Sequence, residues 1–351
     1  MRFPIIDAHV HFWDPKTSPR EVSILVNTFG FNQKLVGFLA EKLFPKSAKE
    51  FFASPEYILK TYAIEEFNKD SDDYTIEGVV HVEASWKGKG KFGPIGETEW
   101  LEYINSNDSS GIKSIVAHAD LSMGKEVRTV LEAHKSASQK VCGIRDMLSW
   151  QPDKRILNGA KSAHKMSDPK WRAGFEQLSD SGKSFEATIY DNQIDELNKL
   201  AKAYPDQKIM LCHAATPIAV GGPFGENGNS EQERDRIFKT WKEGIAKLAE
   251  NQNVWVKISG LAMPVLGFGF EHRKQEPSSE EVVDLLNPLV QHLISAFRIE
   301  RCIFGSNFPI EKVSLSYELL IDSFQKMINN YSEEDQRAFF NLNAKKFYKI
   351  T

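Results

Sequence analysis

The chain has little cysteine, and what it has is not arranged as a disulfide or redox motif. Of its 351 residues only three are cysteines, Cys142, Cys212 and Cys302, and no two of them form a CxxC pair. Each falls in an apolar run that we expect to be a buried strand. An odd number of cysteines without close spacing indicates reduced thiols that pack in the core of a cytosolic protein.

The chain also lacks a long apolar segment and a strong charge of either sign. No stretch approaches the roughly 20 apolar residues that cross a bilayer, and the beginning of the sequence does not have the basic, apolar and cleavage regions of a signal peptide. The net charge of −4 argues against a nucleic acid or an anionic membrane as partner. We therefore predict a cytoplasmic protein whose partner is a small molecule.

What the sequence does contain is a pair of histidines two residues apart at the end of its first apolar run. His9 and His11 follow the segment 3–6, Phe-Pro-Ile-Ile. Side chains two apart in a strand point to the same side, so both imidazoles, with Asp7 behind them, should project from one face. Two such imidazoles can hold a metal ion or polarise a carbonyl. Alternatively, each is hydrogen-bonded and inert.

Apolar runs of this kind recur along the whole chain. Several are continuous rather than alternating, which is typical of strands buried on both faces of a parallel sheet. Amphipathic stretches such as 191–203, 231–250 and 279–297 separate them, with Ser278 or Ser279 as an N-cap of the last. Eight strands alternating with helices predict an α/β protein, a (β/α)8 TIM barrel. The expected strands are residues 4–11, 76–84, 112–119, 141–146, 184–190, 208–213, 253–259 and 302–305.

Residues 14–75 do not fit the repeat and predict a partly helical insertion after strand 1. We expect it to cover part of the barrel mouth or to decorate the surface. Residues 315–328 and 333–348 are predicted to form two closing helices. No change of composition marks a second domain, so residues 1–351 are expected to form a single barrel domain.

Polar and ionisable side chains end nearly every predicted strand. Such groups gather at the C-terminal mouth of a barrel, where catalytic residues lie, and burying them is costly unless they line a polar cavity. In strand order they are His9, His11, His81, Glu83, His118, Asp120, Arg145, Asp146, Glu186, His213, Lys257, Ser259, Ser306 and Asn307.

Four motifs, in this order along the chain, resemble the amidohydrolase superfamily. They are Asp7-Ala-His-Val-His11, Gly143-Ile-Arg145, Leu211-Cys-His213 and Arg301-Cys-Ile-Phe-Gly-Ser-Asn-Phe-Pro309. The chain is most similar to the branch of TIM-barrel hydrolases with sugar-acid and 2-pyrone-4,6-dicarboxylate lactonases. Several ordered motifs are more specific than one alone.

The resemblance implies roles for the matching residues. His9 and His11 would be metal ligands or carbonyl polarisers, and His213 a ligand or a group that orients the substrate. Arg145 would bind a substrate carboxylate or oxyanion with two hydrogen bonds.

The chain departs from the family pattern in two respects that concern metal binding. Asn307 stands where most of the superfamily has an aspartate, and an amide is neither a general base nor a good ligand. The chain also has no histidine in the predicted strand 5 and no lysine in the predicted strand 4 that could hold a second metal ion, so a binuclear centre is not expected. One zinc or manganese ion held by His9, His11 and either Glu83 or Glu186 is one interpretation, and metal-free hydrolysis is the other.

Other polar residues allow two interpretations each. Glu83 either takes part in catalysis or pairs with His81, and Lys257 either binds a substrate carboxylate or pairs with Glu186. His134 falls in a helical stretch and is expected at the surface. The residues assigned to substrate binding are Lys257, Trp86 and His118.

These features predict a hydrolase that opens the lactone of a small anionic or polyhydroxylated ring. Arg145 and the two N-terminal histidines would stabilise the oxyanion, His213 or Glu83 would be the base, and Asn307 would orient the water or the ring oxygen. The alternatives are a metal-dependent amide hydrolase or decarboxylase and a catalytically silent ligand-binding barrel. A homodimer formed through the outer helices is also expected.

Overall fold

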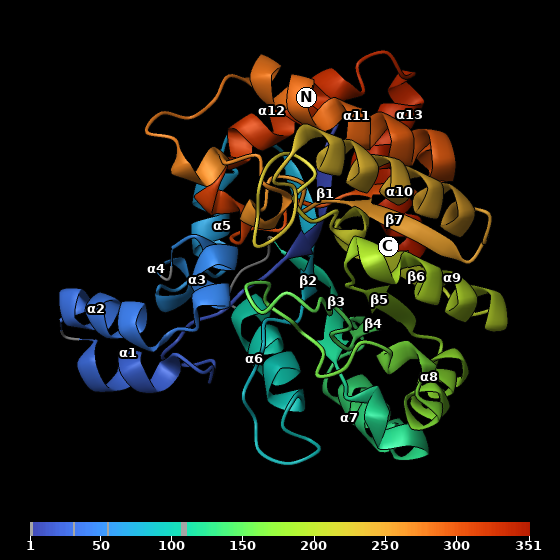
Figure 1. Ribbon diagram of the computed structural model, residues 1–351. Helices are drawn as coiled ribbons and strands as arrows, with labels where there is room; N and C mark the ends of the chain where they lie inside the picture. The colour runs from blue at the N-terminus through green and yellow to red at the C-terminus, as the bar shows by residue number, and fades with distance from the viewer. Residues whose placement is uncertain (1–2, 31, 55, 107–110) are drawn as a thin grey trace.

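The computed structural model describes residues 3–30, 32–54, 56–106 and 111–351. Eight parallel strands form one sheet in the order β1 to β8, with helices around it, as predicted for a (β/α)8 barrel (Figure 1). The strands are β1 (Ile5–Val10), β2 (Ile76–Val82), β3 (Ile112–His118), β4 (Val141–Arg145), β5 (Ser184–Ala187), β6 (Ile209–Leu211), β7 (Val254–Ile258) and β8 (Cys302–Phe304).

Helices lie between the strands and after β8. They are α6 (Ile95–Ser106), α7 (Val127–Ala137), α8 (Pro169–Ser181), α9 (Ile194–Ala203), α10 (Glu231–Ala249), α11 (Ser279–Phe297), α12 (Tyr317–Met327), α13 (Glu333–Arg337) and α14 (Asn343–Tyr348). Of these, α9 to α12 begin and end within three residues of the predicted positions, and the helix predicted over 333–348 is divided into α13 and α14 with a π-helical segment between them. Serine side chains begin two of the longest helices, because the Ser230 and Ser278 hydroxyls accept the N–H groups of Glu233 and Glu281. Of the two serines expected as the N-cap of α11, Ser278 and Ser279, the structure shows that Ser278 is the cap.

The barrel closes between its first and last strands through hydrogen bonds beyond the regular ladder. The amide of Asn307 donates to the His9 carbonyl at 2.8 Å, and the amide of His11 donates to the Phe308 carbonyl at 2.8 Å. These bonds bring the residues that follow β8 against the end of β1. The histidine motif and Asn307, about 300 positions apart in the sequence, therefore lie side by side.

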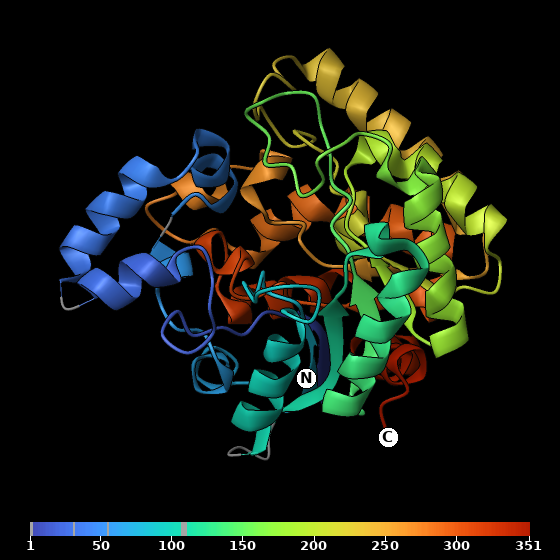
Figure 2. The same cartoon turned by 90° about the horizontal axis from the view of Figure 1, so that it is seen from below.

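The interior of the barrel is filled by apolar side chains at its N-terminal end. Ile6, Val80 and Met210 pack there with Phe347 and Tyr348 of α14, and all five are buried. The C-terminal helix, red in Figure 2, lies at the end where the strands begin. Packing of this kind leaves the opposite, C-terminal end for polar groups.

The insertion after β1 is helical, as predicted. It contains α1 (Ser23–Phe29), α2 (Gln33–Leu43), α3 (Lys46–Phe52), α4 (Glu56–Leu59) and α5 (Ile64–Asp70). The Tyr57 hydroxyl donates to the carbonyl of Lys312 in the segment after β8, and α3 contacts the 3-10 turn Pro264–Leu266 after β7. The insertion therefore reaches the mouth, while α1 and α2 stand away from the barrel in both views (Figures 1 and 2).

The three cysteines are free thiols, as expected. No helix within the described part of the chain has both the length and the apolar character needed to cross a membrane.

Candidate active site

Two buried imidazoles face each other at the end of β1. The Nε2 atoms of His9 and His11 lie 3.2 Å apart, so the expectation that the two side chains project together is confirmed. The Nδ1 atom of His11 lies 2.7 Å from the carbonyl of Val82, and a carbonyl can only accept. His11 must therefore carry its proton on Nδ1, which leaves a lone pair on Nε2 toward His9. We call these two residues the imidazole pair.

The expected place of Asp7 on the same face is wrong. The strand register is irregular between Asp7 and Val10, and the Asp7 carboxylate accepts the amides of His9 at 3.2 Å and Ser306 at 2.9 Å. Its second oxygen accepts the hydroxyl of Tyr317 in α12 at 3.1 Å. Asp7 therefore joins β1 to the end of β8 and to α12, while the imidazole pair turns to the mouth.

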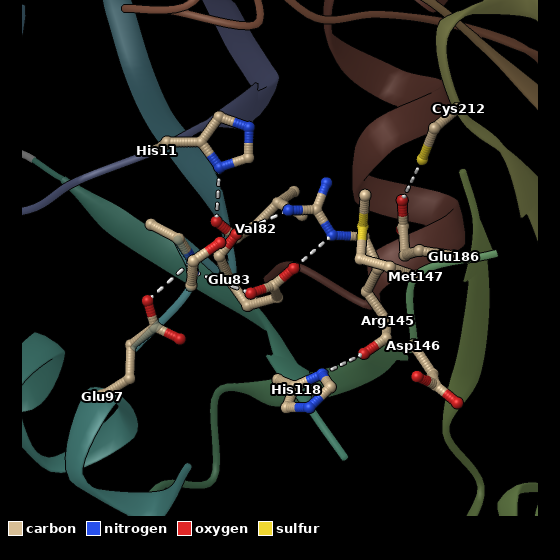
Figure 3. Close-up of polar contacts among 12 residues, drawn as sticks. His11, Val82, Glu83, Glu97, His118, Arg145, Asp146, Met147, Glu186 and Cys212 are labelled. Atoms are coloured by element: carbon tan, nitrogen blue, oxygen red, sulfur yellow. Dashed lines mark hydrogen bonds and ion pairs between the residues drawn. The ribbon is translucent and has the colours of Figure 1, made fainter. Parts of the chain in front are cut away.

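An arginine and a glutamate form a buried ion pair near His11 (Figure 3). Arg145 Nε donates to Glu83 Oε1 at 2.8 Å and its Nη2 donates to the Glu83 carbonyl at 2.6 Å. Burial alone would raise the pKa of Glu83, but the Arg145 guanidinium lowers it to about 2. Glu83 is thus an ionised partner that orients Arg145, and not the partner of His81, whose Nε2 lies 3.6 Å from Glu97.

His213 lies beyond the end of β6, in a strained turn rather than in the predicted strand. Residues 213–216 have φ values of 53°, 52°, 60° and 39°, a left-handed conformation that costs roughly 1–2 kcal/mol per non-glycine residue. Trp241 Nε1 holds the turn by donating to the Ala214 carbonyl at 2.7 Å. Strain of this kind is typical of functional sites.

The turn places His213 against the other histidines. Its ring centroid lies 4.5 Å from that of His9, and its Nδ1 lies 3.0 Å from the Ser259 hydroxyl. Burial, with the charges of Arg145 and Lys257, lowers the pKa of His213 to about 3. Burial, with the charge of Lys257 for His9 and of Arg145 for His11, holds the pKa of both members of the imidazole pair well below the usual value, so all three imidazoles are neutral near pH 7.

Deeper in the barrel, Glu186 is the centre of a second buried polar cluster. Its Oε2 accepts from Lys257 Nζ at 2.9 Å and from the Cys212 thiol at 3.0 Å, and its Oε1 accepts from the Tyr348 hydroxyl at 2.6 Å. Lys257 is therefore paired with Glu186 in this structure, which is one of the two interpretations of this residue, the other being the binding of a substrate carboxylate.

Asn307 follows β8 in a left-handed conformation, with φ of 58°, which asparagine tolerates better than most residues. Its side chain is buried, and Nδ2 has no hydrogen-bond partner among the described residues. A buried amide without a partner is costly, and it is available to a substrate or a water.

The donor set fits a single metal ion at the imidazole pair. Two nitrogens about 2.0–2.1 Å from a tetrahedral zinc lie roughly 3.3–3.4 Å apart, close to the 3.2 Å observed between the two Nε2 atoms. His9, Glu186 and Cys212 form a group whose ligand atoms all lie within 4.8 Å of one another. Glu186 already bonds the Lys257 ammonium, so an ion would have to share that carboxylate.

The two remaining residues assigned to substrate binding lie in different surroundings. The His118 Nδ1 atom lies 3.1 Å from the Arg145 carbonyl, at the edge of the site. Trp86 packs against α6, where its ring centroid is 6.5 Å from that of Trp100. The structure therefore brings His118 close to Arg145, whereas Trp86 contacts a peripheral helix.

Sequence reasoning missed or misplaced several residues that support the site. Tyr348 was expected only as part of a closing helix, and Glu311 was not considered. The Glu311 carboxylate accepts the amides of Gly260 at 2.8 Å and Ala262 at 2.6 Å, and burial raises its pKa to about 8. The expectation that His134 lies at the surface is wrong, because it is fully buried and its Nε2 lies 3.0 Å from the His118 carbonyl.

Comparison with known proteins places this barrel in a family. The sequence profile described as amidohydrolase matches residues 6–350. The chain belongs to the amidohydrolase family. An uncharacterised protein of Sinorhizobium fredii, y4mH, is 30% identical over 349 residues, which cover 99% of this chain and 98% of the relative. L-fucono-1,5-lactonase of Burkholderia ambifaria is 24% identical over 260 residues, or 72% of this chain and 76% of the relative.

Solved structures share the fold at low sequence identity. An amidohydrolase from Burkholderia multivorans with bound zinc has a TM-score of 0.72 at 16% identity and covers 99% of this chain and 100% of its own. A candidate 2-pyrone-4,6-dicarboxylic acid hydrolase from Pseudomonas putida has a TM-score of 0.61 at 16% identity and covers 100% and 99%. A 2,6-dihydroxybenzoate decarboxylase also shares the fold. This amidohydrolase therefore has a scaffold on which hydrolases and decarboxylases are both built.

Proposed function

We propose that this amidohydrolase opens the lactone ring of a small carboxylated or polyhydroxylated compound by the attack of an activated water. The observation that carries the proposal is the cluster of three neutral imidazoles beside Arg145 at the mouth of the barrel. A lactone carbonyl needs an oxyanion site and a base for water, and this cluster contains candidates for both. The similarity to a lactonase over 72% of the chain supports the same reaction.

The Arg145 guanidinium is the group that binds an anionic part of the substrate or the oxyanion. Two of its nitrogens are occupied by Glu83, and Nη1 makes no hydrogen bond with any described residue. Because Glu83 fixes the plane of the guanidinium, Nη1 has a defined direction.

His213 is the base that we favour over Glu83. If its Nδ1 proton is donated to Ser259, Nε2 has a lone pair that can accept a proton from water. Arg145 is one cause of its low pKa, so a substrate carboxylate that binds Arg145 would raise the proton affinity of His213. His213 would then be a stronger base when the substrate is bound than when the site is free. Asn307 would orient the water or the ring oxygen through its free Nδ2.

A metal ion, if bound, would be held by the imidazole pair with Glu186. It would supply Lewis-acid polarisation of the carbonyl and a more acidic water. The roles of Arg145, His213 and Asn307 remain the same with or without it, since these residues bind, accept a proton and orient.

The test is a screen of lactones in which ring opening is followed by proton release to a pH indicator. The panel contains L-fucono-1,5-lactone, other sugar-acid lactones and 2-pyrone-4,6-dicarboxylate. We expect the wild type to open at least one, and Arg145→Lys to raise KM most for carboxylated substrates. His213→Gln should lower kcat, while Asn307→Asp should change the pH profile by adding a carboxylate.

Two results would contradict the proposal. The first is a wild type that opens no lactone but releases carbon dioxide from a carboxylated aromatic compound, which would favour decarboxylation. The second is an Asn307→Asp variant with unchanged rate and pH profile, which would remove this residue from the chemistry.

A further inference from the structure

A cavity lies at the end of the barrel opposite to the candidate active site. It has a volume of about 430 Å3 and is formed where strands β3 to β6 begin, next to the C-terminal residues after α14. This volume is in the range of small-molecule sites, about 300–1,000 Å3. Its charged lining consists of Lys113, Lys140, Lys183, Lys208, Lys349 and Asp206.

The charge of this lining is strongly one-sided. Five of the lining residues are lysines and one, Asp206, is acidic. Among the described residues only Lys140 of these lysines has a carboxylate partner, since its Nζ lies 2.7 Å from Glu102. Lys113, Lys183, Lys208 and Lys349 form no ion pair within the described part of the chain. The protein as a whole is acidic, with a net charge of −4, so this concentration of cations is local.

Lys183 is a cation of this lining whose charge is not neutralised by a carboxylate of any described residue. It is half-buried at the start of β5, and its ammonium donates to the carbonyl of Val141 rather than to a carboxylate. Burial, together with the charges of Lys135 and Lys349, lowers its pKa. A half-buried ammonium without a carboxylate partner is an unfavourable arrangement, which a bound anion would relieve.

The remaining lining groups already have protein partners and shape the cavity around the lysines. The Ser179 hydroxyl donates to Gln207 Oε1 at 2.7 Å, the Ser181 hydroxyl donates to the Leu178 carbonyl at 2.9 Å, and the Gln207 amide donates to the carbonyls of Lys183 and Lys208. The buried rings of Phe347 and Tyr348 form an apolar wall, and Lys208 Nζ lies 6.0 Å from the Phe347 ring centroid. Charged, polar and apolar groups thus meet in one cavity.

We propose that this cavity binds a small molecule that carries phosphate groups. Lysine is a common phosphate ligand because its ammonium is a compact point charge with three donors, and several without carboxylate partners suit a ligand of more than one negative charge. The site lies at the opposite ends of the strands from Arg145 and the imidazole pair, so the proposal does not depend on the proposed lactone hydrolysis.

The test measures the binding of inorganic pyrophosphate to the full chain by isothermal titration calorimetry. The cavity variant is Lys208→Gln/Lys349→Gln. Both lysines are exposed and their side chains make no hydrogen bond to any described residue, so the fold should be retained. The matched control is Lys239→Gln/Lys247→Gln on the exposed face of α10, which changes the net charge equally. Citrate serves as the carboxylate arm.

We expect one pyrophosphate per chain, with a dissociation constant that rises at least tenfold in the cavity variant and is unchanged in the control. Binding should weaken as salt is added. Equal binding by the cavity variant would overturn the proposal, because the anion would then lie elsewhere, for example at Arg145. Equal losses in both variants, which indicate a net-charge effect, or tighter cavity-dependent binding of citrate would also overturn it.

Discussion

Replacement of Glu83 by glutamine tests whether the buried Arg145–Glu83 pair organises the site. The substitution keeps the size of the side chain and removes its charge. Arg145 would retain its bond to the main-chain carbonyl of residue 83 but would lose the ionic bond from Nε, which is 2.8 Å long in the wild type. The guanidinium would then be left in a buried position, 6% exposed, without a compensating charge.

The structure gives the size of the effect. The pKa of Glu83 is lowered from the usual 4.5 to about 2, and this difference corresponds to about 3 kcal/mol of native-state stability at 1.36 kcal/mol per pH unit. Removal of one partner from a buried pair costs about 3–5 kcal/mol in other proteins. We expect Glu83→Gln to lower the free energy of unfolding by about 3 kcal/mol at pH 7.

The pH dependence has a definite sign. A carboxylate whose pKa is lower in the native state stabilises the protein fully above the unfolded-state value of 4.5. This stabilisation is lost as the pH falls toward 2. The difference in stability between wild type and Glu83→Gln should therefore be constant from pH 7 to pH 5 and should shrink below pH 4.5.

The assay is urea unfolding followed by tryptophan fluorescence at several pH values. Glu102→Gln is the control, because Glu102 pairs with Lys140 where both side chains are about one third exposed, 31% and 33%. Such pairs contribute about 0–1 kcal/mol. If the free energy of unfolding falls by less than 1 kcal/mol in both variants, the buried Arg145–Glu83 pair does not stabilise the protein as proposed. On a lactone identified by the screen, Glu83→Gln should also lower kcat/KM roughly 10- to 100-fold through misplacement of Arg145.

Three further predictions concern the turn, the metal and the backbone. Gly260→Ala puts a methyl 2.5 Å from His213 Nδ1, whereas the methyl of Gly269→Ala, at a similar positive φ, meets nothing within 4 Å. We expect turnover to fall only in Gly260→Ala, while the positive φ costs each variant about 1 kcal/mol of stability. Elemental mass spectrometry of protein purified without added metal should find about one zinc or manganese per chain, lost when both histidines of the imidazole pair become alanine; metal retained by that variant would place it elsewhere. Arg298→Gly should raise the unfolding free energy by about 1 kcal/mol, because φ of 62° and ψ of 148° strain a non-glycine residue; an unchanged denaturation midpoint would contradict this.

The regular part of the fold could be predicted because its signal is local. Each of the eight strands lies within its predicted range, and helices such as α11 begin and end at the predicted residues. The strands end one to three residues earlier than expected, and the difference falls at the site. His213 was assigned to a strand by its apolar neighbours, but it lies in a left-handed turn. Apolar periodicity does not report backbone conformation of this kind.

The contacts that complete the site could not be predicted because they join distant parts of the chain. The bond from Tyr348 to Glu186 spans 162 positions and that from Tyr317 to Asp7 spans 310. The irregular register after Asp7 also broke the rule that alternate residues share a face. A single sequence specifies which residues are polar, but the pairing of buried charges depends on which helix closes the barrel.

The charges around the site indicate what it needs in order to act. Each buried cation is paired with one carboxylate, Arg145 with Glu83 and Lys257 with Glu186. The cations nevertheless lower the pKa of His213, and Asn307 adds no charge where the family pattern has an aspartate. A metal ion would add further positive charge. If His213 is the base, as proposed, a substrate carboxylate bound to Arg145 would offset this positive charge and raise the proton affinity of His213. Carboxylated lactones should therefore exceed neutral ones in kcat as well as in KM, a difference that simple electrostatic attraction of the substrate would not produce.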